Sequence, residues 1–210
     1  MNQELRSASI RIGSTAPKFE ARSTMGVRKL SDYRGRWLVL FSHPADFTPV
    51  CTSEILAFAR LHGEFLALNC ELLGLSVDSL FAHMGWIGAM EGTFGVTIPF
   101  PLLEDPSMAI ARAYGMLDPD AADSATVRMT LVIDPDGIVR MTSTYPMTTG
   151  RSVHEVLRTV QALQVTDAHN VYTPEGWSIG DRVIDADLML GTGAGSPDWF
   201  FRTSALGDKS

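Results

Sequence analysis

A strand–helix–strand unit in the first half of the chain constrains its fold more than any other feature of the sequence. The apolar run at 37–42 predicts a buried strand, which Pro44 ends. A helix is then predicted from residue 49 to about residue 61, because positions 55, 58, 59, 62 and 66 recur at spacings of three and four, as on one face of an amphipathic helix. Gly63 is expected to loosen or end a turn there. Residues 71–77 predict a second buried strand. A helical connection of this kind joins parallel strands, so we expect an α/β fold.

The remaining pattern predicts a central mixed β-sheet flanked by helices. Further helices are expected at 80–91, 106–114 and 152–163, and further strands at 100–103, 127–134 and 138–145. The last two strands form a hairpin through a Pro-Asp-Gly turn. Short pieces at 16–19 and 27–30 could pair at a sheet edge.

The composition of the chain changes at about Gln164: beyond it Pro, Gly and Asp are scattered and the hydrophobic periodicity is weak. We interpret residues 164–210 as a C-terminal arm or small subdomain after a main domain at 1–163. Four large aromatic side chains, Trp177, Trp199, Phe200 and Phe201, lie there. Leaving them in water is costly, so we expect them to pack on the main domain or on a second subunit.

Cys51 is the first candidate for chemistry. Thr48 is a suitable helix N-cap, and Pro49 then occupies the first helical position, which places Cys51 in the first turn. We expect the Thr48 hydroxyl to accept a hydrogen bond from a backbone N–H near Cys51. Unpaired N–H groups and the helix dipole favour a thiolate there, and the thiolate is the nucleophile.

The alternative is that Cys51 is a small buried apolar residue, which is the common fate of a free cysteine. The polar neighbours His43, Thr48 and Glu54 argue against it, because a core cysteine does not need them.

Composition excludes several other functions. The net charge of −7 over 210 residues does not favour a nucleic-acid surface, which needs clustered Lys and Arg. No apolar stretch approaches the ~20 residues of a membrane-spanning helix, and the N-terminal residues lack the apolar core of a secretory signal, so we expect a cytoplasmic protein. The five histidines are scattered without ligand spacing, so no metal and no cofactor are predicted.

Three motifs resemble those of peroxiredoxins. The segment SHPADFTPVCTSE, which holds Pro44, Thr48 and Cys51, is similar to the active-site motif of the one-cysteine branch. The segments ATVRMTLVIDPDG and YPMTTGR also match, and the resemblance extends over about 12–183. It implies a thioredoxin-like fold and a thiol-dependent peroxidase acting on hydrogen peroxide and organic hydroperoxides.

The resemblance assigns roles to four residues. Cys51 would attack a peroxide oxygen and become a sulfenic acid, Thr48 would hydrogen-bond the peroxide, and Pro44 would shield the sulfur from water. Arg128 would supply a fixed positive charge. From the residues alone, the end of a solvated edge strand is the favoured interpretation of Arg128, and the resemblance reverses it.

Three further residues are expected to support these four. The resemblance implies that Glu54 orients the arginine and that Arg151 lies near the pocket, although both also fit exposed positions at helix starts. His43 marks the one-cysteine branch, and its ring could polarise peroxide, bond the sulfur or fill space.

The second cysteine, Cys70, is not expected to pair with Cys51. A helix of about 13 residues, ~20 Å long, separates them, whereas a disulfide needs Cα atoms within about 7 Å. The late Val-Cys-Pro segment of two-cysteine peroxiredoxins reads Val171-Tyr172-Thr173-Pro174 here. Reduction by an external thiol, a small thiol or a redox protein, is therefore expected. The serine motif linked to lipase activity in some animal members is also missing, since that region reads Arg34-Gly35-Arg36-Trp37.

Two other functions could use a cysteine on the same fold. A disulfide oxidoreductase needs Cys-x-x-Cys, and Cys51 is followed by Thr-Ser-Glu. A peroxide sensor or chaperone-like redox protein is the alternative that stays open. The resemblance also implies a homodimer, with a ring of dimers as a further assembly.

Overall fold

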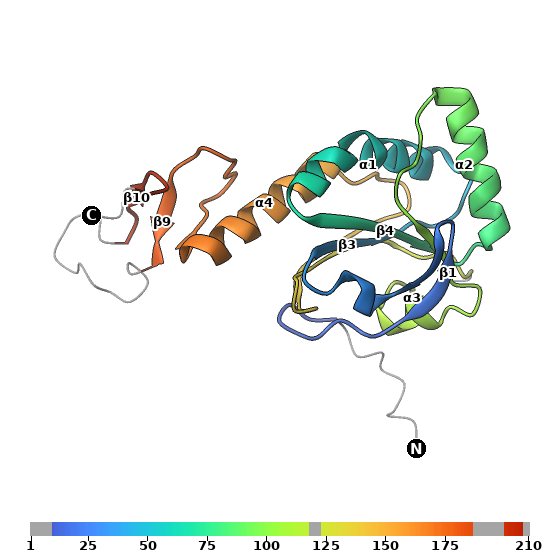
Figure 1. The fold of residues 1–210 in the computed structure, drawn as a ribbon, viewed down its shortest axis with the longest axis horizontal. Helices are drawn as coiled ribbons and strands as arrows, with labels where there is room; N and C mark the ends of the chain where they lie inside the picture. Colours follow the sequence, from blue (N-terminus) through green and yellow to red (C-terminus); the bar gives the residue numbers. More distant parts are fainter. Residues whose placement is uncertain (1–9, 118–122, 187–199, 208–210) are drawn as a thin grey trace, which may run out of the picture. The chain divides into compact units, whose positions relative to one another are not determined.

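The computed structural model describes residues 10–117, 123–186 and 200–207 (Figure 1). By its internal contacts the chain divides into two units, residues 1–153 and 154–210. The prediction that the main domain ends at residue 163 stays a prediction.

A mixed sheet of seven strands forms the first unit, in the order β2-β1-β5-β4-β3-β6-β7. Its strands are β1 (Glu20–Ser23), β2 (Gly26–Lys29), β3 (Trp37–Ser42), β4 (Cys70–Ser76), β5 (Leu102–Glu104), β6 (Arg128–Ile133) and β7 (Val139–Tyr145). The helices are η1 (Leu30–Tyr33), α1 (Pro49–Ala67), α2 (Leu80–Phe94) and α3 (Ala109–Ala113). Strands β3 and β4 are parallel and flank α1 in sequence, which confirms the predicted strand–helix–strand unit.

Alternation along β3 divides the core between the two faces of the sheet. Leu38 and Leu40 belong to the cluster that includes Tyr114 beside α3, whereas the Phe41 ring stacks on Phe58 of α1 with centroids 4.1 Å apart. Figure 1 shows α1 and α3 on opposite sides of the sheet. All six residues of β3 are buried, as its apolar sequence predicted. The strand that leads to Cys51 is therefore held rigidly from both sides.

Several predicted boundaries were wrong. Helix α1 continues through Gly63 to Ala67, because packing of its buried face outweighs the low helix propensity of one glycine. Helix α3 starts only at Ala109, since the Asp105 carboxylate accepts the Ala109 N–H at 3.0 Å and holds the preceding residues in a turn. The edge hairpin is β1 with β2, and residues 16–19 lie outside any strand.

The C-terminal unit has a small core of its own. Helix α4 (Val153–His169) runs six residues past its predicted end, and β8 (Val171–Tyr172), β9 (Val183–Asp185) and β10 (Thr203–Ser204) form a three-stranded sheet. Trp177 is buried there beside Val171 and Val183, so it needs neither the main domain nor a second subunit to cover it. Phe200 and Phe201 are exposed on the chain, and Trp199 lies outside the described residues.

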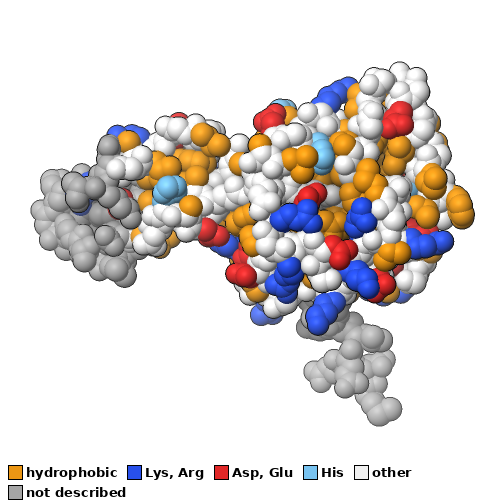
Figure 2. Space-filling view, in the orientation of Figure 1, with side chains coloured by type: hydrophobic (Ala, Val, Ile, Leu, Met, Phe, Trp, Pro, Cys, Tyr) orange, Lys and Arg blue, Asp and Glu red, His pale blue; other side chains and the backbone are white. Residues whose placement is uncertain are grey.

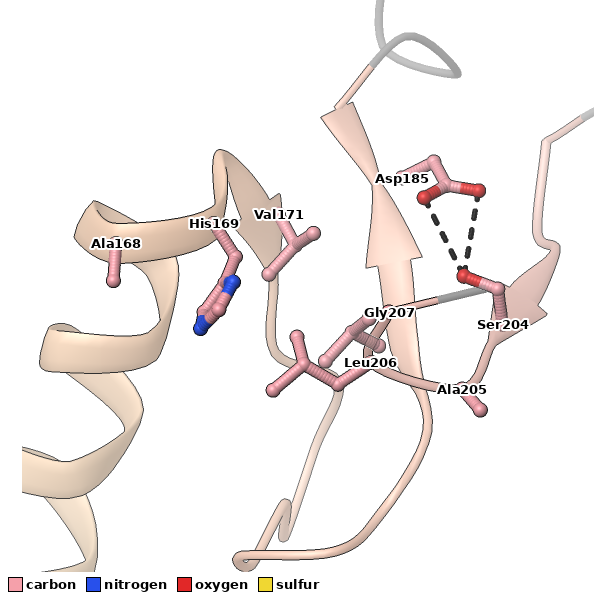
Figure 3. Close-up of a pocket in the computed structure, with 9 residues that line it drawn as sticks. Ala168, His169, Val171, Asp185, Ser204, Ala205, Leu206 and Gly207 are labelled. Carbon is pink, nitrogen blue, oxygen red and sulfur yellow. Dashed lines mark hydrogen bonds between the residues drawn. The ribbon is translucent and has the colours of Figure 1, made fainter. Parts of the chain in front are cut away.

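A pocket of about 270 Å³ opens in the C-terminal unit (Figure 3). It is lined by the end of α4, by β8 and β9, and by residues 204–207. The Ser204 Oγ lies 3.4 and 3.5 Å from the two carboxylate oxygens of Asp185. The lining contains none of the site residues predicted from the sequence.

Charged side chains of both signs are interspersed on the face of the first unit shown in Figure 2. They form no continuous basic patch on that face. Among the described residues, no helix combines the length and the apolar character that crossing a bilayer requires.

Candidate active site

Cys51 lies in the first turn of α1, directly beyond the carboxyl end of β3. Its side chain is fully buried. Thr48 is the N-cap, with extended backbone angles, and Pro49 is the first helical residue, as predicted. The predicted cap hydrogen bond was wrong: the Thr48 hydroxyl donates to the Ala45 carbonyl at 2.8 Å. Because that bond uses the hydroxyl hydrogen, the oxygen lone pairs of Thr48 remain able to accept a hydrogen bond.

Arg128 points its guanidinium at the sulfur. Its Nη1 lies 3.3 Å from the Cys51 Sγ and 2.8 Å from the Glu54 Oε2. Its Nε and Nη2 both donate to the Met147 carbonyl, at 3.0 and 2.9 Å. Arg128 is only 3 % exposed, so it is not the end of a solvated strand. Both sides of the guanidinium are held, which fixes the direction of the N–H that meets the sulfur.

Glu54 and Arg151 complete this arrangement. The Glu54 Oε1 accepts the Arg151 backbone N–H at 2.8 Å and Nε at 3.0 Å, and Oε2 accepts Nη2 at 2.9 Å. Arg151 also donates to the Ser42 carbonyl at 2.7 Å and the Met129 carbonyl at 2.9 Å. Both side chains are buried. Arg151 thus links the ends of β3 and β6 to the helix that carries Cys51.

The buried charges around the sulfur do not cancel. Glu54 contributes one negative charge, and Arg128 and Arg151 contribute two positive charges. An unpaired charge away from water costs several kcal/mol, in order of magnitude, so this cluster favours a neighbouring anion. The sulfur of Cys51, in contact with Arg128, lies where such an anion would be stabilised. The helix N-terminus acts in the same direction.

The ionised form of Glu54 depends on this pairing. Burial alone would raise the pKa of Glu54, but the hydrogen bonds and charge of Arg151, aided by Arg128, outweigh it and hold the pKa below its ordinary value. A carboxylate whose pKa is lower in the folded state stabilises the fold above its unfolded pKa. That stabilisation is lost as the pH falls through the folded value.

We therefore expect Glu54→Gln to lower the free energy of unfolding by about 3 kcal/mol at neutral pH, because two buried arginines lose their carboxylate. The difference from wild type should shrink as the pH falls through the lowered pKa of Glu54, where Glu54 itself becomes protonated. Urea unfolding at neutral and acidic pH measures both effects. The exposed Glu64 of the same helix offers a control, and Glu64→Gln should change little. A difference between wild type and Glu54→Gln that stays constant with pH would contradict the assigned ionisation.

His43 faces a second buried polar group. Its Nε2 lies 2.8 Å from the Asp46 Oδ1, and the Asp46 Oδ2 lies 2.7 Å from the Nδ1 of His83, on α2. Burial lowers the pKa of His43, against the opposing effect of Asp46. The His43 Nδ1 is buried without a hydrogen-bond partner among the described residues. The two histidines, which looked scattered in sequence, therefore share one carboxylate.

This trio also has the composition of a metal site, since its ligand atoms lie within 4.8 Å of one another. Both nitrogens already make hydrogen bonds of normal length to the two carboxylate oxygens. Hydrogen bonds to Asp46 therefore hold the three side chains together.

Cys70 lies near the opposite end of β3 from Cys51. It starts β4 and pairs with Trp37 at the start of β3, whereas Cys51 follows the end of β3. Burial, and then the charge of Glu71, raise the pKa of Cys70 to about 12. A thiol of this kind stays protonated and unreactive at neutral pH.

The fold thus brings together Cys51, Glu54, Arg128 and Arg151, with Thr48 at the cap of the same helix. Pro44 is buried in the loop between β3 and α1, where it offers no N–H. Sequence reasoning missed Asp46, His83 and the Met147 carbonyl. Of these three, only Asp46 had a signal in the sequence, because it lies three residues after His43.

A buried cysteine at a helix N-terminus, in contact with a fixed arginine on a mixed sheet, defines a thiol-dependent oxidoreductase site. Residues 12–142 match the model of the AhpC/TSA family, and residues 162–188 match the C-terminal domain of 1-Cys peroxiredoxin. The chain belongs to the AhpC/TSA family, in the one-cysteine peroxiredoxin branch, and is a thiol peroxidase.

Relatives and solved structures agree with this assignment. A peroxiredoxin of Aquifex aeolicus is 50% identical over 168 residues, covering 80% of this chain and 76% of the relative. Peroxiredoxin 2 of Picrophilus torridus is 42% identical over 198 residues, covering 91% and 98%. The yeast mitochondrial 1-Cys peroxiredoxin has a TM-score of 0.79 at 42% identity, covering 84% of this chain and 86% of that one. A cysteine-to-serine mutant of the peroxiredoxin 6 of Arenicola marina has a TM-score of 0.79 at 38% identity, covering 84% of each. These likenesses confirm the predicted thioredoxin-like fold.

Proposed function

We propose that this chain reduces hydrogen peroxide and organic hydroperoxides with Cys51 as its single peroxidatic cysteine. The observation that carries the proposal is the 3.3 Å contact between the Arg128 Nη1 and the Cys51 Sγ within a buried cluster of net positive charge. This contact stabilises the thiolate and places a donor where negative charge develops during attack.

In the peroxide step, the Cys51 thiolate attacks one oxygen of ROOH. The S–O bond forms as the O–O bond breaks, sulfur is oxidised to a sulfenic acid, and the alkoxide leaves as ROH after taking up one proton. The Thr48 oxygen accepts a hydrogen bond from the peroxide O–H, and Arg128 stabilises the charge that moves between the oxygens. Pro44 excludes a competing donor, and the His43 Nδ1 accepts a hydrogen bond from the sulfenic acid.

The sulfenic acid is reduced by a thiol from outside the chain. A first thiol displaces water and forms a mixed disulfide with Cys51, and a second thiol releases the Cys51 thiol and a disulfide. The position of Cys70 at the far end of β3 supports an external reductant. The yeast neighbour is described as resolved via glutathione/thioredoxin systems, which fits either a small thiol or a redox protein here.

We expect excess peroxide without thiol to add whole oxygens to the chain, and not to remove two hydrogens. A sulfenic acid that meets no thiol is oxidised further to sulfinic and sulfonic acid. Intact mass spectrometry with peptide mapping should place every added oxygen on Cys51. With a small thiol present, the mixed disulfide or the reduced chain should appear instead.

The contrary result is a loss of two hydrogens with a peptide that joins Cys51 to Cys70 within one chain. That result would make this a two-cysteine enzyme whose first helix opens during turnover. A homodimer, with a ring of dimers as a further assembly, is part of the proposal and is tested by mass in solution. The cytoplasmic location stays a prediction.

A further inference from the structure

The hydrogen-bond partners of His43, Asp46 and His83 determine which of their nitrogen and oxygen atoms carry a hydrogen. The His83 Nε2 lies 3.1 Å from the Leu103 carbonyl, which can only accept, so Nε2 carries a hydrogen. The His83 Nδ1 lies 2.7 Å from the Asp46 Oδ2. Two lone pairs would repel at that distance, so one proton lies between them. Either His83 is an imidazolium, or Asp46 is a protonated acid.

The surrounding charges favour the imidazolium. Burial would raise the pKa of Asp46, but its hydrogen bonds to His43 and His83 outweigh it and lower the pKa. Two more carboxylates act on the trio: Asp78 on His43, and Glu104 on His83. Asp78 also accepts the Asp46 backbone N–H at 3.0 Å. Among the described residues Glu104 is paired with Arg22, so one cation and three carboxylates surround the two histidines.

His43 is then the neutral member. Asp46 accepts at Oδ1, so the His43 Nε2 carries the hydrogen of that ring. The Nδ1 is left as a bare lone pair, buried and without a partner among the described residues. Were His83 neutral beside an ionised Asp46, the unbalanced carboxylate would draw a second proton onto His43 and convert that acceptor into a donor.

We propose that His83 is a positioning residue of the active site, which neutralises Asp46 as an imidazolium and so keeps the His43 Nδ1 an unprotonated acceptor for the sulfenic acid or peroxide at Cys51. His83 acts through two hydrogen bonds and never touches the substrate. This inference rests on the proposed function for its consequence in turnover, but its proton arrangement is measurable without turnover.

The test begins with the wild-type chain, reduced and labelled with ¹⁵N in its histidines. Two-bond ¹⁵N–¹H spectra at neutral pH should show His83 protonated on both nitrogens and His43 protonated on Nε2 alone. A neutral His83 would overturn the proposal, whatever the activity. If the shifts are as expected but no peroxide is reduced, the proton arrangement stands and the proposed function fails.

Two variants then separate the charge of His83 from its shape. His83→Gln keeps a hydrogen-bond donor toward Asp46 but removes the positive charge. The pH at which His43 titrates should rise by about one unit or more, and Cys51 oxidation below that pH should slow about tenfold. Asp46→Asn/His83→Gln removes both charges, so it should return the His43 titration and the oxidation rate to within about twofold of wild type.

The matched control is His62→Gln, which changes a half-buried histidine of α1 that packs against Phe100. It should leave the His43 shifts and the pH profile unchanged. If His83→Gln behaves like this control, or if the double variant remains as impaired as His83→Gln, the proposal is wrong. A merely structural role for His83 would lower stability without moving the His43 titration and without rescue.

Discussion

Replacement of Cys51 by serine should abolish peroxide reduction. The hydroxyl of serine stays protonated at neutral pH, and it is a far weaker nucleophile than the thiolate that Arg128 and the helix N-terminus stabilise. Because the remaining groups of the site act only through that sulfur, the rate should fall by about 10⁴-fold or more, to the background of the assay. Peroxide consumption with a small thiol as reductant, followed in stopped flow, measures the loss.

Cys70→Ser is the matched control, since both cysteines are fully buried and the substitution is the same. We expect it to keep most of the activity, with a modest loss of stability from a buried hydroxyl. A folded Cys70→Ser chain as inactive as Cys51→Ser would contradict the single-cysteine mechanism.

Arg128→Met should slow the oxidation of Cys51 by about 10²–10³-fold, because it removes the only described cation in contact with the sulfur and a donor to the transition state. The thiolate absorbance should also appear at a higher pH than in the wild type. Stopped-flow oxidation and a pH titration of ultraviolet absorbance measure the two effects.

Arg128→Met should lower the stability of the fold much less than it lowers the rate of Cys51 oxidation. Glu54 keeps three hydrogen bonds from Arg151 in the Arg128→Met chain, so its charge remains paired. Arg151→Met should be more damaging to stability, because it also frees the Ser42 and Met129 carbonyls. Arg140→Met, on the neighbouring strand β7 and paired with Asp134, is the control for losing a strand arginine. An unchanged oxidation rate in Arg128→Met would remove Arg128 from the site.

The part of the fold that could be predicted is the part where local pattern and burial agree. Apolar β3 and β4, with the proline-started helix between them, are confirmed because each carries its own signal. The short helix α3 was misplaced, since a turn held by Asp105 precedes it. The ends of α1 and α4 were missed because packing, and not propensity, carries those helices past the residues where the pattern fades.

In the site, too, local sequence pattern predicted some residues, and others were placed only by the tertiary structure. The first-turn position of Cys51 followed from Thr48 and Pro49 alone. Arg128 could not be placed from its own strand pattern, which fits a solvated edge; the resemblance pointed to it, and the structure shows why it is buried. The position of His83 beside the Asp46 carboxylate had no sequence signal, because α2 reaches the loop only in three dimensions.

The charge of the buried cluster around Cys51 has a consequence for the catalytic cycle. With a thiolate present, Glu54, Arg128, Arg151 and Cys51 sum to zero, whereas a protonated sulfenic acid leaves one positive charge without a counter-ion. The negative charge of the thiolate passes to the leaving alkoxide, and the proton that converts the alkoxide into the alcohol neutralises it. Each oxidation therefore removes one negative charge from the buried cluster. The positive charge that remains attracts the thiolate form of the reductant to the site.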